Sequence, residues 1–355
     1  MKIAHVEIRE SRLPKIDKEW RFALAAMPVQ EGWVVVIHAE DGHVGYGYAS
    51  SMPHVGSPHE DVRADLERLT APLVGKDSRL INVLLDDVDR MGFKTTQAKA
   101  GIDCALHDLL ARRLNVPIAQ LFGGAAVREF RTLRILPIKS PEEMARNARA
   151  LADKGFRHFK IKIHGNIEED VACVAAVRKE VGPDMNLTVD ANQSYKSADD
   201  AIKALNLMLP YKLDLAEQPV NVDDFAGLKK VADAVSTPIE ADESAESLDN
   251  IIRLVRERAV DAVSLKISKL GGLRGVYAAA QICAAGGVNY RMGAHSGPRI
   301  LSAHGAQIAS ALPGIWYASE LTEFDGLEKD PWNGLELKDG VLRLPDAPGC
   351  GVTPE

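Results

Sequence analysis

Two neighbouring segments decide the fold: His158-Phe159-Lys160-Ile161-Lys162-Ile163 and Leu187-Thr188-Val189-Asp190-Ala191-Asn192. Each is a short strand-like run that ends in polar side chains, and a segment with helical spacing lies between them. This is the pattern of a βα unit in a parallel sheet. The same alternation continues in both directions along the chain.

About eight such strands follow one another from about residue 130, and eight is the number that closes a (β/α)₈ barrel. The predicted strands are Arg131–Ile138, His158–Ile163, Leu187–Ala191, Leu213–Glu217, Pro238–Asp242, Ala262–Ile267, Val288–Ala294 and Ile315–Glu320. Helix starts lie between them, at Ser140-Pro141-Glu142-Glu143 and at Ser197-Ala198-Asp199-Asp200, where a serine N-cap precedes acidic residues. The sequence therefore predicts an α/β barrel.

The first 125 residues have a different, α+β pattern. Asp41-Gly42 separates two strand-like runs, Gly32–Ile37 and His43–Tyr48, which predicts a hairpin with a two-residue turn. Apolar residues spaced by three and four predict a helix over Ala98–Leu114. With 355 residues, the chain is long enough for two domains.

Composition excludes several classes of partner. Lys and Arg number 43 against 50 Asp and Glu, which gives a net charge of −7, and the basic residues are scattered, so we expect no nucleic-acid partner. The four cysteines lie far apart, which predicts neither disulfides nor a zinc site and favours a reducing cytoplasm. A charged start and the lack of an 18-residue apolar run predict a cytoplasmic chain with no membrane partner.

Seven successive predicted strands end in polar side chains, about 24 to 29 residues apart. Because functional groups of such barrels lie at the carboxyl ends of the strands, we expect these side chains to surround one mouth. They are Lys160 and Lys162, Asp190 and Asn192, Glu217, Asp242 and Glu243, Lys266, His295 and Glu320.

Three of these residues, Asp190, Glu217 and Asp242, offer carboxylates from adjacent strands. Hard oxygen ligands without clustered Cys or His favour Mg²⁺ over Zn²⁺. A single acid at a strand end is more often a helix cap or a solvated carboxylate, but three in succession argue for a site. Strand alternation lets only one of Asp242 and Glu243 point inward; we favour Asp242 as the ligand, with Glu243 beside it.

The lysines are predicted to be catalytic. Lys160 and Lys162 share one side of their strand, and Lys266 lies four strands further on, across the mouth. Two ammonium groups on opposite sides of a divalent ion can act on the two faces of one carbon, and we expect their pKa values to be lowered by the surrounding positive charge. The alternative, solvated surface lysines, does not suit positions inside a barrel.

Two aromatic residues are open to more than one interpretation. His295 is either a ligand or base, or a hydrogen-bonded core residue. A tryptophan in a position like that of Trp316 is more often a packing residue than a cation-binding face.

The sequence does not indicate a dinucleotide site, because the glycines at 45–47 and 271–275 do not match its spacing.

The chain resembles the enolase superfamily, in its mandelate racemase and muconate lactonizing enzyme group. The matching motifs are residues 98–108, Lys160-Ile161-Lys162, Asp190-Ala191-Asn192, Glu217-Gln218-Pro219, Asp242-Glu243-Ser244 and residues 266–272. The resemblance implies an N-terminal capping domain over a modified barrel, Mg²⁺, and removal of a proton α to a carboxylate to give an enediolate. Lys266 resembles the muconate lactonizing subgroup, because the mandelate racemase type has Asp at that strand.

The resemblance places the capping domain at residues 1–125, completed by the tail 326–355, and the barrel at residues 126–325. It implies an isomerase for a small carboxylate, and we expect a homo-oligomer. We favour a racemase or epimerase of an N-substituted or cyclic amino-acid derivative, with Lys162 and Lys266 as acid/base groups and Lys160 polarising the carboxylate. A cycloisomerase of muconate type, a dehydratase, and a barrel that binds carboxylate or metal without turnover remain alternatives.

Substrate specificity is expected from two capping loops, Asp17–Glu31 and Ala49–Pro58, and from the last strand ends. The loops carry Trp20 and Met52, and Trp316 could contribute, which suits a small, partly apolar carboxylate. Glu320 is the predicted polar contact at the eighth strand. Dipeptide epimerases of the group carry Asp-x-Asp there, whereas this chain has Ala318-Ser319-Glu320.

Overall fold

The computed structural model describes residues 1–355. It begins with a three-stranded antiparallel sheet of β1 (Ile3–Pro14), β2 (Val29–Ala39) and β3 (Val44–Ser50). The hairpin predicted at Asp41-Gly42 is confirmed, but the two-residue turn is wrong, because β2 ends at Ala39 and β3 begins at Val44. Gly42 has a φ of 86°, a conformation that glycine adopts without strain.

Two helices, α1 (His59–Thr70) and α3 (Thr96–Leu114), pack against this sheet, and α2 (Ile81–Met91) packs against α3. The predicted helix over 98–114 is confirmed as α3, which is buried along most of its length. Gly47 of β3 permits the close approach, since a Cβ there would lie 2.0 Å from the carbonyl oxygen of Gly101. A cluster of 19 buried apolar residues lies between these elements.

A seven-stranded parallel sheet forms the second part of the molecule, in the order β11-β10-β9-β8-β7-β6-β5. Its strands are β5 (Leu133–Leu136), β6 (His158–Lys162), β7 (Asn186–Asp190), β8 (Leu215–Glu217), β9 (Ile239–Ala241), β10 (Ala262–Leu265) and β11 (Asn289–Met292).

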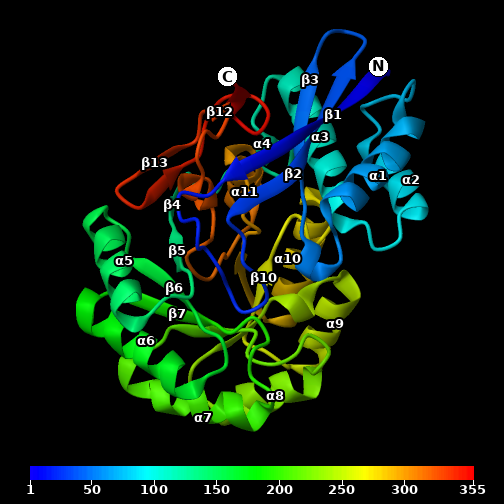
Figure 1. Cartoon of the computed structure of the whole chain (residues 1–355). Helices are drawn as coiled ribbons and strands as arrows, with labels where there is room; N and C mark the ends of the chain where they lie inside the picture. Colours follow the sequence, from blue (N-terminus) through cyan, green and yellow to red (C-terminus); the bar gives the residue numbers. More distant parts are fainter.

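Helices connect these strands, and Figure 1 shows α5 to α9 curving around the lower part of the molecule, away from β1–β3. They are α5 (Pro141–Asp153), α6 (Ile167–Val181), α7 (Ala198–Met208), α8 (Phe225–Ala234), α9 (Leu248–Glu257), α10 (Leu273–Gly286) and α11 (Arg299–Ala311). The predicted caps are confirmed: Ser140 and Ser197 accept hydrogen bonds from the N–H groups of Glu143 and Asp200. A second cluster of 66 buried apolar residues includes the barrel core.

The prediction of an eighth regular strand at Ile315–Glu320 is wrong. Only Ser319 forms a bridge, to Thr132. The segment still lies between the two edge strands, because Leu133 N–H donates to the Ser319 carbonyl at 3.0 Å and Glu320 N–H donates to the Met292 carbonyl at 2.9 Å. The barrel is therefore closed by an irregular segment.

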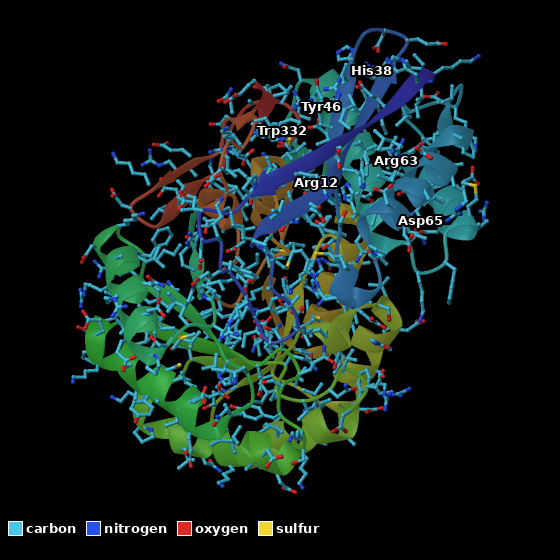
Figure 2. All side chains as sticks on the ribbon, in the orientation of Figure 1. Arg12, His38, Tyr46, Arg63, Asp65 and Trp332 are labelled. Carbon is cyan, nitrogen blue, oxygen red and sulfur yellow. The ribbon has the colours of Figure 1, made fainter.

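The C-terminal residues contact both parts of the molecule. β14 (Val341–Arg343) pairs with β13 (Glu336–Lys338) and with β4 (Glu129–Arg131), which precedes the barrel. β12 (Trp332–Asn333) pairs with β15 (Thr353–Pro354). Figure 2 shows Trp332 beside Tyr46 of β3, and their ring centroids are 5.5 Å apart.

The short helix α4 (Ile118–Leu121) follows α3 and contacts the same tail, since Ile118 N–H donates to the Gly349 carbonyl at 2.8 Å. No helix in the chain combines the length and the apolar character needed to cross a membrane. The division at residues 125 and 326 stays a prediction.

Candidate active site

The strand ends bring the predicted polar residues together. Lys162, Asp190 and Glu217 are the last residues of β6, β7 and β8. The parallel register pairs Lys162 with Asp190 and Asp190 with Glu217. Asp242 directly follows β9, and Lys266 directly follows β10.

Each predicted catalytic lysine lies against one of the predicted metal ligands. Lys162 Nζ donates to Asp190 and, at 2.9 Å, to Asn192 Oδ1. Lys266 Nζ donates to Asp242 Oδ2 at 2.5 Å. Glu217 lies on the strand between these two acids in the sheet order. The row of carboxylates therefore has one lysine at each end.

The carboxylates fit a divalent cation. Asp190, Glu217 and Asp242 are almost completely buried, and Glu217 Oε1 has no hydrogen-bond partner. Burial and the neighbouring Asp190 raise the pKa of Glu217 well above its usual value. Buried carboxylates that repel one another and retain an unpaired oxygen suit a hard cation such as Mg²⁺.

Glu243 and Asn192 lie beside this row. Asn192 Nδ2 donates to Glu243 Oε1 at 3.1 Å, while Glu243 Oε2 is buried without a partner. Burial, followed by the charges of Asp242 and Asp190, raises the pKa of Glu243 to about 7. Both oxygens of Asp242 accept hydrogen bonds from lysines, one from Lys266 and one from Lys269 at 2.7 Å. Which of Asp242 and Glu243 is the third metal ligand stays a prediction.

The lowering of lysine pKa values expected beside a bound divalent ion stays a prediction, and for the protein alone the pKa values of Lys160 and Lys266 shift the other way. Burial alone lowers the pKa of each ammonium, but the carboxylates in direct contact outweigh it and raise both values. Lys160 lies 2.8 Å from Glu217 and 3.3 Å from Asp190. The acids at the strand ends therefore favour the protonated form of both groups as long as no divalent ion shares these carboxylates.

A charged layer inside the barrel supports these side chains. Arg291 of β11 is fully buried and donates to Glu217 at 2.7 Å, to Glu240 at 2.7 and 3.1 Å, and to Glu320 at 2.7 Å. Arg291 and Glu240 are not among the site residues predicted from the sequence. Glu240 precedes Asp242 by two residues, so strand periodicity could have placed it on the same inward face.

Glu320 belongs to this layer and does not present a free oxygen to the mouth. One of its oxygens accepts from Arg291 and contacts Lys160, and the other accepts from Ala294 N–H at 3.3 Å. The predicted substrate contact by Glu320 is therefore replaced by a supporting role for Lys160 and Arg291.

The capping loops cover the mouth as expected. Lys162 Nζ lies 5.4 Å from the ring centroid of Phe22, and Phe22 contacts both Trp20 and His54, with centroids 5.7 and 5.1 Å away. Burial and the charges of Lys266 and Lys162 lower the pKa of His54 to about 4. Met52 is buried in the same loop.

Trp316 and His295 have different positions. The placement of Trp316 at the mouth is wrong, because its N–H donates to the carbonyl of Tyr290, near the amino end of β11. It therefore lies at the opposite end of the barrel. His295 bonds to Ser268 Oγ through Nδ1, and burial together with Lys266 lowers its pKa well below the usual value, so its imidazole is neutral.

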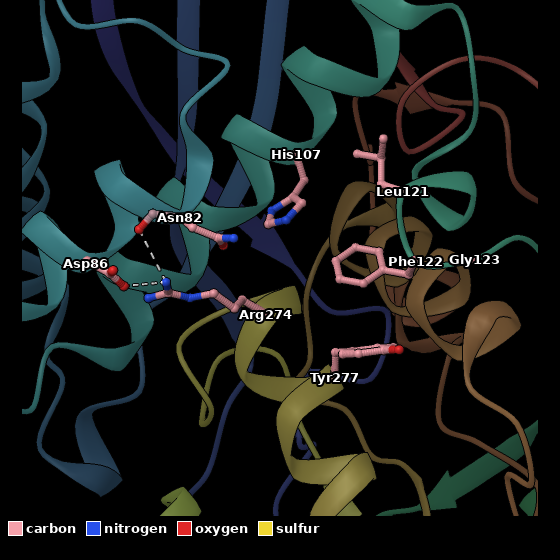
Figure 3. Close-up of a pocket in the computed structure, with 8 residues that line it drawn as sticks. All are labelled: Asn82, Asp86, His107, Leu121, Phe122, Gly123, Arg274 and Tyr277. Carbon is pink, nitrogen blue, oxygen red and sulfur yellow. Dashed lines mark hydrogen bonds and ion pairs between the residues drawn. The ribbon is translucent and has the colours of Figure 1, made fainter.

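A cavity of about 790 Å³ lies elsewhere, between α2, α3, α4 and α10. Figure 3 shows Arg274 directed at Asp86 on one side of this cavity, and the two side chains form an ion pair at 2.7 Å. His107, which also lines it, is paired with Asp103 at 3.2 Å. None of the predicted site residues lines this cavity, so its size carries no information about the reaction.

A separate buried trio, Asp108, His304 and Cys350, has possible ligand atoms within 4.8 Å of one another. The Asp108 carboxylate, however, accepts from Arg112 at 2.6 Å, Tyr46 N–H at 2.9 Å and Cys350 N–H at 2.6 Å. These bonds attach the C-terminal tail to α3 and β3, so the trio is structural.

Known proteins share both the sequence pattern and the structure. Residues 10–123 match the family described as mandelate racemase / muconate lactonizing enzyme, N-terminal domain, and residues 143–355 match enolase C-terminal domain-like proteins. The hydrophobic dipeptide epimerase of Enterococcus faecalis is 32% identical over 99% of this chain and 100% of its own length. The N-succinyl-L-Arg/Lys racemase of Bacillus cereus is 30% identical over 99% of this chain and 95% of its own.

The solved structure of the L-Ala-D/L-Glu epimerase from Bacillus subtilis superposes with a TM-score of 0.96 at 29% identity, covering 100% of this chain and 99% of that one. Muconate cycloisomerases are also among the relatives. All of these relatives are isomerases. The chain belongs to the mandelate racemase and muconate lactonizing enzyme group of the enolase superfamily.

Proposed function

We propose that the protein is a racemase or epimerase that inverts the α-carbon of an amino-acid derivative. The observation that carries this proposal is the placement of Lys162 and Lys266 at the two ends of one row of buried carboxylates. A neutral lysine amine on one side of a carbon can remove a proton from that face, and the ammonium of the lysine on the other side can deliver a proton to the opposite face. The epimerase and racemase relatives support the same chemistry.

In this proposal Asp190, Glu217 and Asp242 hold Mg²⁺, which when bound neutralises the substrate carboxylate and favours the second negative charge of the enediolate. Lys160 is placed to polarise the same carboxylate. Phe22 and His54 cover Lys162 and exclude water from it. The solved structure of the Enterococcus faecalis relative contains Mg and a dipeptide.

Exchange of the α-proton in deuterated water tests the proposal. The wild-type protein with Mg²⁺ is expected to incorporate deuterium into both enantiomers of an N-acyl amino acid. Lys162→Gln and Lys266→Gln are each expected to abolish racemisation, while each retains exchange with one enantiomer only, the opposite one in the two variants. Full activity in either variant contradicts the assignment.

Lactone formation from a muconate is the second candidate, because muconate cycloisomerases are relatives. That reaction can proceed with one lysine as acid/base and the other as an electrostatic partner. Loss of activity in one lysine variant with retention in the other, on a muconate substrate, would favour it.

A further inference from the structure

Lys15 is a buried cation that the proposed chemistry does not use. It follows the last residue of β1, its exposed fraction is 4%, and no carboxylate oxygen lies within 4.0 Å of its Nζ. The ammonium donates to Ser296 Oγ at 3.0 Å and lies 3.7 Å from the ring centroid of Trp20. A buried charge without an ionic partner is costly, so its retention calls for an external partner.

The backbone holds Lys15 firmly. Its N–H donates to the Pro28 carbonyl at 2.9 Å, and the adjacent Ile16 N–H donates to the Gly326 carbonyl at 2.9 Å. A bridge also joins Lys15 to Leu327. The ammonium is therefore placed by backbone pairing to the capping loop and to the C-terminal tail, and little side-chain ordering is needed on binding.

Lys15 borders the mouth of the barrel. Its partner Ser296 directly follows His295, and its aromatic neighbour Trp20 contacts Phe22, which covers Lys162. Lys15 also lies close enough to Lys162 for the two charges to interact. A substrate held at Lys162 and Lys266 can therefore extend to Lys15.

We propose that Lys15 and Ser296 bind a second carboxylate of the substrate, distant from the carboxylate at the metal. This inference rests on the proposed function and deepens it, because it makes the substrate a dicarboxylic amino-acid derivative. The second carboxylate belongs either to the N-acyl group or to the amino-acid side chain. An ammonium and a hydroxyl that donate together suit a carboxylate, and charge-assisted bonds of this kind discriminate well against a neutral group.

Two matched pairs of compounds distinguish these sources. N-succinylalanine and N-succinamoylalanine differ only by carboxylate against amide on the acyl group, and N-acetylglutamate and N-acetylglutamine differ in the same way on the side chain. In one pair the wild-type protein is expected to favour the carboxylate by about tenfold to a hundredfold in kcat/KM for α-proton exchange. Lys15→Met should remove that preference, and Lys15→Arg should retain most of it.

Lys139→Met is the matched control. Lys139 lies at the same rim but is already paired with Asp17 at 3.2 Å and Glu19 at 2.9 Å. Its loss can loosen the capping loop and slow both members of a pair, but the ratio between them should not change. Equal kcat/KM for carboxylate and amide in both wild-type pairs would overturn the proposal, as would a preference that survives in Lys15→Met.

Calorimetric titration of the Mg²⁺-loaded protein separates this inference from the proposed function. If none of the four compounds exchanges its α-proton, the proposed function fails for these compounds. Tighter binding of one carboxylate member in the wild-type protein, lost in Lys15→Met, would still support the anion site. Equal binding of acid and amide in both pairs would refute it.

Discussion

Replacing Arg291 by Met is expected to destabilise the barrel strongly, because Arg291 hydrogen-bonds to three buried carboxylates of the charged layer. The change removes four hydrogen bonds, to Glu217, Glu240 and Glu320. It also leaves three buried carboxylates, of which Glu217 and Glu320 still contact Lys160, while Glu240 loses its ion-pair partner. Breaking a buried ion pair by removing one partner costs about 3–5 kcal/mol.

That free energy converts into a modest but measurable change in Tm. At about 2.1 cal/mol/K per residue, the 355 residues give an unfolding entropy of roughly 0.75 kcal/mol/K. A loss of about 3–5 kcal/mol then lowers Tm by about 4–7 °C. Differential scanning calorimetry measures this decrease in Tm. The control is Arg256→Met, because the Arg256 side chain is exposed and its loss should shift Tm by less than about 1 °C.

The pH dependence has a definite sign. Burial already raises the pKa of Glu240 in the folded protein, and removing Arg291 should raise it further. A carboxyl with a higher pKa in the folded than in the unfolded state makes stability fall as pH rises. The Tm deficit of Arg291→Met should therefore shrink between pH 8 and pH 5, and Glu240→Gln should recover part of it at pH 8. A Tm within 1 °C of wild type, or a deficit that grows on acidification, would refute the reasoning.

Three further predictions follow from particular contacts. Gly47→Ala should lower Tm by several degrees because its Cβ would lie 2.0 Å from the Gly101 carbonyl oxygen, whereas Gly326→Ala, with nothing within 4 Å, should be near neutral; calorimetry on both measures the contrast. Exhaustive chelation should abolish α-proton exchange and added Mg²⁺ should restore it, and exchange that persists in the chelated protein would exclude the metal from the reaction. Burial lowers the pKa of Lys15 to about 8, and the positive charges of Lys162 and Arg134 lower it as well. The negative charges of Glu323 and Asp17 act in the opposite direction and raise it. Because Lys15 must be protonated to bind an anion, the carboxylate-over-amide ratio of kcat/KM should be constant below pH 8 and fall above it, and Lys15→Met should show no such fall.

The sequence predicts those parts of the structure that depend on local pattern. Strand ends such as Lys162 and Asp190 follow from the βα repeat, and the N-cap at Ser140 follows from its immediate neighbours. The last barrel segment could not be placed in this way. Trp316 and Glu320 lie in one short run, but hydrogen bonds to two edge strands, rather than a strand pattern, decide where each one lies.

Long-range partners explain the remaining differences. Arg291 gives no sign in sequence that it pairs with Glu217, 74 residues away. Lys15 is one lysine among several near the N-terminus until the fold brings it to Ser296, 281 residues away. The protonation of buried groups also depends on the fold. Burial lowers the pKa of Lys266, but direct contact with Asp242 outweighs this effect and raises it.

The pairing of the β1 end with residues 326–328 has a consequence for synthesis on the ribosome. Pro14 and Ile16 hydrogen-bond to Glu328 and Gly326, so this part of the cap cannot reach its final position until almost the whole chain has been translated. Contacts of such large sequence separation form slowly. Closure of the barrel depends on Ser319 and Glu320, which are translated only shortly before, so the N-terminal cap and the barrel are both completed by the same late stretch of the chain.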